Sequence, residues 1–236
     1  MVSLNKTVLL FAALLLSFTA AFSQKKKVIY QDTLQNNIDF IESISIIYTG
    51  RYKWFFDEHD PKTRFVKPIA TTKSEFDSLV NETEQKFTKH DIIGKTIQDF
   101  DVVDIDGRRY NSTDLKGKVL VFNFWFVGCG PCEVEMPELN QLMERYKNND
   151  NVVFLSFAKS PETKVRKFLT KKEFKYPVTI LTKDQFDAYK LGSFPTNAII
   201  DKQGVCTFAS SGIGIGGVHI LRKYLKKALS ESSEKL

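Results

Sequence analysis

Continuous apolar runs alternate with segments of helical spacing in the chain from residue 91 onward. Residues 119–126 are apolar at almost every position, which is expected of a strand buried on both faces of a sheet. Residues 152–157 form a second run of this kind. Between the two runs, residues 131–147 repeat apolar side chains every three or four positions, and this spacing predicts an amphipathic helix.

The same alternation continues on both sides of these elements. Asp106-Gly107 predicts a hairpin turn between two short strands. Toward the C-terminus we expect a basic helix, a short strand, a helix, a hairpin and a final amphipathic helix, at residues 161–173, 178–181, 183–190, 197–208 and 218–229 respectively. This order predicts an α/β fold in which helices cover both faces of a mixed central sheet.

Residues 24–90 follow a different pattern. Two apolar stretches, 51–56 and 64–66, flank a polar segment that is typical of a turn between strands. Thr72 and Glu75 have the spacing of a capping box and predict a helix that extends to about residue 89. Between residues 28 and 48 the apolar positions are scattered. We interpret this segment as a small α+β appendage packed on the main domain, with a partner-docking surface as the alternative.

The first 23 residues have the composition of a secretory signal peptide. Lys6 supplies a short basic region, residues 8–22 are apolar, and Ala21-Phe22-Ser23 provides a cleavage site before Gln24. A retained anchor is the alternative, but 15 apolar residues are few against the ~20 that a membrane helix needs. We therefore expect domains at 1–23, 24–90 and 91–236, and an exported protein, soluble after cleavage and periplasmic if the source has two membranes.

Charge and histidine content narrow the possible functions. The formal net charge is +6, and it falls to +5 when Lys6 is removed. The lysines occur in short runs without interleaved aromatic residues on one face, so we do not expect nucleic-acid binding. The three histidines are isolated and suggest no metal site. A glycine-rich run at 212–217 follows a hairpin, so we interpret it as a flexible turn into the last helix and not as a phosphate loop.

The motif Cys129-Gly130-Pro131-Cys132 stands where the buried strand ends and the helix begins. At a helix N-terminus, unpaired N–H groups and the helix dipole stabilise a thiolate. Pro131 suits the first helical turn because its missing N–H would have no partner there. We expect Cys129 to be the nucleophile that attacks a substrate disulfide, and Cys132 to attack Cys129 and release the reduced substrate.

Two other uses of the cysteines are less favourable. A structural disulfide that closes a loop with two intervening residues removes little chain entropy and so stabilises little. A zinc site would need a second cysteine pair, and only Cys206 remains among the three cysteines. Cys206 lies in an apolar β-run, where a buried and inert cysteine is the ordinary expectation and a third redox thiol the alternative.

Several motifs in order along residues 91–231 resemble the TlpA/ResA type of exported thiol–disulfide oxidoreductases. They are I-G-K-T-I-Q-D-F at 93–100, D-L-K-G-K at 114–118, N-F-W at 123–125, the C-G-P-C motif, E-M-P at 135–137 and F-P-T at 194–196. The resemblance implies a thioredoxin fold, with residues 151–172 as the strand and helix that this family inserts. One departure is Gly128, where the family usually has a tryptophan before the first cysteine.

The resemblance also implies roles for individual residues. Glu135 corresponds to an active-site glutamate that can shuttle a proton, although a solvated helix glutamate is the alternative. Asn123 stands where thioredoxin has a buried acid, which leaves Glu135 as the local proton carrier. The Phe194–Pro195 peptide is expected to be cis, with Phe194 contacting substrate, against an ordinary trans proline. Trp125 and Phe126 are expected to line the substrate site, with core packing as the alternative for both.

These observations predict an exported enzyme that reduces disulfides in protein substrates without a cofactor. The C-G-P-C motif is that of thioredoxin, whose potential is about −270 mV. The resemblance implies a membrane thiol donor of the DsbD/CcdA kind. A peroxiredoxin is excluded, because its signature would need proline at 122 and threonine at 126, and both are phenylalanine. The remaining alternative is a non-catalytic binding or metal-delivery module.

Overall fold

A five-stranded sheet forms the centre of the computed structural model, which describes residues 26–231 except for 88, 190 and 213. The expected signal peptide therefore lies outside the described residues. The strand order is β11 (Cys206–Ser211), β10 (Thr196–Ile200), β7 (Val119–Trp125), β8 (Val152–Ala158) and β9 (Val178–Ile180). Strands β7, β8 and β9 are parallel, and β10 is antiparallel to both of its neighbours. The predicted mixed sheet is confirmed.

Strand β7 is buried along its whole length, because apolar layers cover both faces of the sheet. Val121 and Trp125 point to the layer formed by α4 (Gly130–Tyr146) and α7 (Gly217–Ser230), near α5 (Glu162–Leu169). Phe122 and Phe124 point to the opposite layer, which includes Phe186 of α6 (Lys183–Ala188). The hairpin of β5 (Asp101–Val103) and β6 (Arg109–Asn111) also packs on that side.

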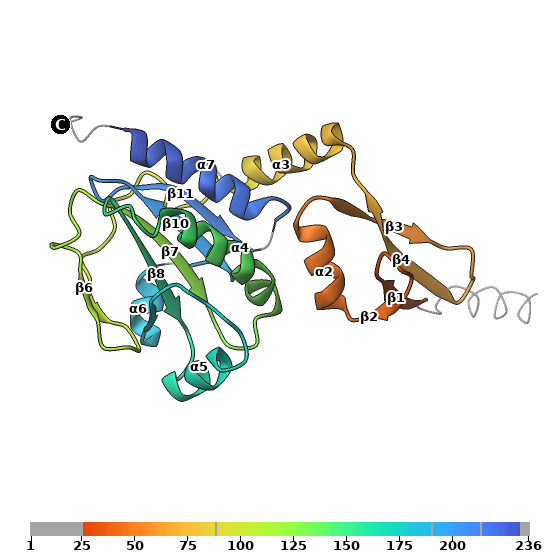
Figure 1. Ribbon diagram of the computed structural model, residues 1–236, viewed down its shortest axis with the longest axis horizontal. Helices are drawn as coiled ribbons and strands as arrows, with labels where there is room; N and C mark the ends of the chain where they lie inside the picture. The colour runs from red at the N-terminus through yellow and green to blue at the C-terminus, as the bar shows by residue number, and fades with distance from the viewer. Residues whose placement is uncertain (1–25, 88, 190, 213, 232–236) are drawn as a thin grey trace, which may run out of the picture.

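The N-terminal appendage contains a second sheet, drawn at the right of Figure 1. Its strand order is β2 (Asn37–Ile38), β1 (Lys27–Gln31), β4 (Thr63–Ala70) and β3 (Tyr52–Asp57). The β3–β4 hairpin and the helix α3 (Lys73–Phe87) agree with the predicted elements. The capping box is present: the Glu75 amide donates to Thr72 Oγ1 over 3.2 Å, and the Thr72 amide donates to Glu75 Oε2 over 2.9 Å.

The sequence pattern did not predict α2 (Phe40–Tyr48), which lies between the appendage sheet and α4 (Figure 1). A capping box starts this helix too. The Glu42 amide donates to Asp39 Oδ1 over 2.8 Å, and the Asp39 amide donates to Glu42 Oε2 over 3.1 Å. Asp39 and Glu42 therefore hold the local signal for a helix, in a segment whose scattered apolar residues concealed it.

The glycine-rich run turns into α7, as predicted, and two of its glycines also form a packing seam with α3. A Cβ added to Gly214 would lie 2.5 Å from Thr83 Cγ2 and 2.8 Å from Phe87 Cζ, both on α3. A Cβ on Gly216 would lie 2.8 Å from a Val80 methyl group. Because side chains at these positions would collide with α3, the glycines allow the appendage to pack closely on the main sheet's helical layer.

The appendage thus packs on the rest of the chain, while the boundary near residue 90 stays a prediction. Lys223 of α7 also forms an ion pair with Glu84 of α3, at 2.7 Å between Nζ and Oε1.

Within the described ranges, no helix combines the length and the apolar character needed to cross a membrane.

Candidate active site

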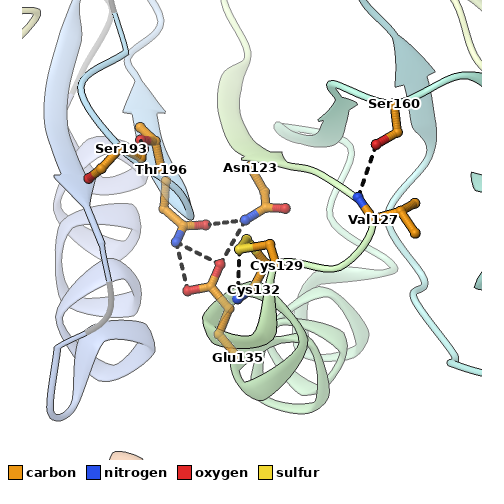
Figure 2. The surroundings of a disulfide bond; sticks show 9 residues. Asn123, Val127, Cys129, Cys132, Glu135, Ser160, Ser193 and Thr196 are labelled. Carbon is orange, nitrogen blue, oxygen red and sulfur yellow. Dashed lines mark hydrogen bonds between the residues drawn. A yellow bond between two sulfur atoms is a disulfide. The ribbon is translucent and has the colours of Figure 1, made fainter. Parts of the chain in front are cut away.

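A disulfide joins Cys129 and Cys132 at the start of α4 (Figure 2). Cys129 is the N-cap of the helix, and its Sγ accepts a hydrogen bond from the Cys132 amide over 3.3 Å. Both side chains are buried: Cys129 is 4% exposed and Cys132 is 1% exposed. The pair follows the carboxyl end of β7, the central strand of the sheet, and α4 directs its unpaired N–H groups at Cys129, which favours a thiolate after reduction.

Gly128, just before the first cysteine, has a backbone conformation that other residues rarely adopt. Its φ angle is +92°, in the left-handed region. A Cβ at this position would meet no heavy atom within 4 Å, so the surrounding space is open. The backbone, and not crowding, therefore accounts for glycine where the resemblance leads one to expect tryptophan.

Glu135 lies one helical turn after Cys132 and is 3% exposed. Its carboxyl group accepts hydrogen bonds from two side-chain amides, Asn123 Nδ2 at 2.9 Å and Asn197 Nδ2 at 3.1 and 3.0 Å. Figure 2 shows these bonds beside the disulfide, where side chains from β7, α4 and β10 converge. The expected alternative of a solvated helix glutamate does not hold, because the carboxyl group is enclosed.

Burial raises the pKa of Glu135 to about 8, although the amides of Asn197 and Asn123 act in the opposite direction by stabilising the carboxylate. The carboxyl group is therefore mostly protonated at pH 7. A carboxyl group with this pKa is present in both protonation states near neutral pH, which is what a proton carrier for thiol chemistry needs.

Asn197 is a site residue that sequence reasoning missed. It lies directly opposite Asn123 in the register of β10 and β7, and its Oδ1 accepts a hydrogen bond from Asn123 Nδ2 over 3.0 Å. A polar residue at the start of an otherwise apolar strand was the available signal. Its meaning depended on the strand register, which brings it across the sheet to Glu135.

The Phe194–Pro195 peptide is cis, as predicted. Hydrogen bonds tie this loop to its neighbours. The Gly212 amide donates to the Pro195 carbonyl over 2.7 Å, and Thr196 Oγ1 donates to the Ser193 carbonyl over 2.6 Å. The loop is thereby held in a defined position by backbone and side-chain contacts.

Phe194 contributes to an aromatic surface next to the disulfide. Its ring meets that of Phe126 edge-on, with 5.4 Å between the ring centroids, and Phe126 is 36% exposed. The Cys129 amide donates to the Phe126 carbonyl over 3.2 Å, which places this surface directly before the motif. Lys159 Nζ lies 5.8 Å from the Phe194 centroid. An apolar or aromatic side chain of a substrate would find contacts here.

Trp125 does not line this surface, which corrects its expected role in substrate binding. The side chain is 0% exposed, and its ring packs against Phe168 and Phe174. The indole Nε1–H donates to Ser156 Oγ over 2.6 Å, so its polar group is satisfied within the core. The next residue, Phe126, is the exposed aromatic side chain.

Cys206 lies in the apolar layer opposite α4. Burial raises its pKa to about 12, and its thiol donates to the Phe208 carbonyl over 3.2 Å. A thiol with so high a pKa is a poor nucleophile at neutral pH. In the part of the chain that the structure describes, no three histidine, cysteine or acidic side chains group as metal ligands.

Comparison with known proteins places this site in a family. The Redoxin family model matches residues 92–225. A thiol-disulfide oxidoreductase ResA of Bacillus cereus is 37% identical over 113 residues, which are 48% of this chain and 65% of that protein. ResA of Bacillus anthracis is 36% identical over 137 residues, which are 57% of this chain and 78% of that protein. The first alignment thus spans just under two thirds of its relative.

The solved structures agree in fold. A thiol:disulfide interchange protein of the thioredoxin family from Chlorobium tepidum TLS superposes with a TM-score of 0.51 at 24% identity, over 60% of this chain and 100% of that chain. The predicted thioredoxin fold and the resemblance to the TlpA/ResA type are confirmed. Residues 24–90 lie outside the region that the family model matches.

Proposed function

The chain belongs to the Redoxin family, and we propose that it is an exported thiol–disulfide oxidoreductase that reduces disulfides in protein substrates. The observation that carries the proposal is the Cys129–Cys132 disulfide at a helix N-terminus, next to the buried carboxyl group of Glu135. The ResA relatives bear the name of this activity.

The first step uses the reduced protein. The Cys129 thiolate, stabilised by the amides at the start of α4, attacks one sulfur of the substrate disulfide. A mixed disulfide forms between Cys129 and the substrate, and the other substrate sulfur leaves as a thiolate that takes a proton. Phe126 and Phe194 support this step by offering an apolar surface directly before the motif.

The second step needs a base for Cys132. Its thiol is buried and has to lose a proton before its sulfur can attack Cys129 and release the second substrate thiolate. The ionised fraction of Glu135 accepts that proton, and the two amides hold the carboxyl group in place. The step ends with the Cys129–Cys132 disulfide and a protonated Glu135, so the substrate gains the two electrons that the protein loses.

The next cycle requires an electron donor. We propose that a membrane thiol protein of the DsbD/CcdA kind returns the two electrons to the pair, because an exported compartment is kept oxidising. The C-G-P-C motif favours the reducing direction. Export rests on the signal-peptide pattern of residues 1–23.

A disulfide reduction assay tests the proposal. The mature chain, which begins at Gln24, is mixed with insulin and a limiting amount of dithiothreitol. The rate at which the insulin chains separate is then measured. We expect the unaltered chain and Cys206→Ser to accelerate the reaction equally, and Cys129→Ser to abolish the acceleration. Equal rates with and without the unaltered chain would contradict the proposed activity.

A further inference from the structure

The appendage reaches the redox motif itself. A Cβ added to Gly130, the residue after Cys129, would overlap Ile41 Cδ1 of α2 and would lie 3.1 Å from Ile41 Cγ1. Gly130 thus permits a close approach between its backbone and the Ile41 side chain. Figure 1 shows α2 alongside α4, away from the appendage's outer hairpin. A helix outside the family-matched region therefore covers part of the thiol pair's surroundings.

Helix α2 is anchored at its other end. Tyr48 is 4% exposed, and its carbonyl accepts a hydrogen bond from the Gly216 amide over 3.3 Å. The Tyr48 hydroxyl would lie 3.4 Å from a Cβ on Gly217, so the ring packs against the start of α7. Ser43 and Ile44 are also buried. These contacts fix α2 on the main domain and hold Ile41 over the motif.

An exposed apolar side chain flanks the motif on each side. Ile41 stands at Gly130, and Phe126 stands before Cys129, and each of these side chains is 36% exposed. A thiolate can attack a disulfide only if the disulfide reaches the sulfur. Cys129 is only 4% exposed, so a substrate disulfide has to come close to the neighbouring side chains before it reaches the sulfur. An extended segment needs less room for this approach than a bulky folded surface does.

We propose that α2 is a wall of the substrate site, and that Ile41 selects disulfides in extended, apolar segments over disulfides on bulky folded surfaces. The inference rests on the proposed function for its substrate, but the wall itself is a property of the fold. The proposal gives residues 24–90 a role in substrate specificity, although the redox chemistry itself does not require these residues.

Thiol alkylation tests the wall without turnover. In a Cys132→Ser, Cys206→Ser background, Cys129 is the remaining thiol. Its rates with N-ethylmaleimide and with a maleimide on a long polyethylene glycol chain are compared, because the two reagents share one reactive group. Ile41→Ala is expected to raise the ratio of the large-reagent rate to the small-reagent rate by roughly threefold or more.

A matched control comes from Ile69 of β4, which is 39% exposed and belongs to the same appendage. Ile69→Ala should leave the ratio unchanged. Ile41→Trp should lower the ratio, because the larger side chain narrows the access to Cys129. Unfolding of α2 would raise the ratio in both Ile41 variants, so the opposite directions distinguish the two causes. An unchanged ratio in both Ile41 variants would overturn the inference.

The same variants in the unaltered cysteine background separate this inference from the proposed function. Ile41→Ala should increase the reduction rate of a folded protein disulfide more than that of an unfolded, apolar peptide disulfide. If the alkylation ratio depends on Ile41 but no disulfide is reduced, the proposed function fails while the wall stands. If disulfides are reduced and the rates do not depend on Ile41, the role of α2 as a wall is rejected while the proposed function is kept.

Discussion

Asn123 and Asn197 face each other across β7 and β10, and the side-chain amide of each donates a hydrogen bond to the carboxyl group of Glu135. The register of two antiparallel strands thus places two donors over a carboxyl group that α4 carries to the sheet. Burial favours the protonated form of Glu135 and the amides favour the ionised form. The balance leaves a carboxyl group that can gain and lose a proton near neutral pH, as its proposed role requires.

Glu135→Gln should slow the reduction of substrate by a factor on the order of 10². The amide cannot accept the proton of Cys132, so the mixed disulfide persists. The wild-type rate should rise with pH as the carboxyl group ionises around pH 8, and the variant should lose that inflection. Stopped-flow kinetics between pH 6 and pH 9 measure both effects, and a profile with the same inflection in both proteins would rule out this role.

Asn197→Leu should move the same inflection to higher pH. The leucine removes a donor that stabilises the carboxylate, so the pKa of Glu135 rises further from its ordinary value. Titration followed by the carbon-13 chemical shift of the Glu135 carboxyl group measures the change directly. A shift to lower pH would show that the Asn197 amide does not act on the ionised form.

Folding stability should fall as pH rises from about 4.5 to about 8, through the contribution of Glu135. In this window the folded protein holds a proton on Glu135 that the unfolded chain has lost, so each rise in pH favours unfolding. Each unit by which the pKa of Glu135 differs between the folded and the unfolded state changes the free energy of unfolding by about 1.4 kcal/mol, so the contribution amounts to a few kcal/mol. Urea unfolding at pH 5 and pH 8 should show a lower free energy of unfolding at pH 8, and the difference between the two pH values should be smaller in Glu135→Gln.

The seam between α3 and the glycine-rich run gives a prediction about the appendage. Gly214→Ala should destabilise its packing by about 1–3 kcal/mol, because the added methyl group meets Thr83 and Phe87. Gly192→Ala is the matched control, since a Cβ there would meet no heavy atom within 4 Å. Limited proteolysis of residues 24–90 should accelerate in the first variant only. Equal cleavage rates in the two variants would mean that α3 accommodates the added methyl group without a loss of packing free energy.

Local signals allowed the sequence to predict most of the fold and the core of the site. The apolar run of β7, the cysteine pair and the start of α4 adjoin one another in the chain, so their arrangement follows from the order of the residues. Asn197 differs, because it becomes a site residue only when the register of β10 on β7 is known. Ile41 depends on tertiary packing, since nothing near it in sequence points to Gly130.

Trp125 illustrates a different difficulty. Alternation along a strand sends neighbouring side chains to opposite faces, and in a strand buried on both faces neither side is marked by polarity. Proximity to the motif therefore could not distinguish Trp125, which packs in the core, from Phe126, which is exposed where the strand ends.

The equilibrium reduction potential of the Cys129–Cys132 pair tests the central claim most directly. The mature chain is equilibrated in glutathione or dithiothreitol buffers, and the fraction of reduced Cys129 is determined by alkylation. We predict a potential at or below about −230 mV, which suits a protein that donates electrons to substrate disulfides. A potential near about −120 mV would make the protein an oxidant and would contradict the proposed direction of electron flow.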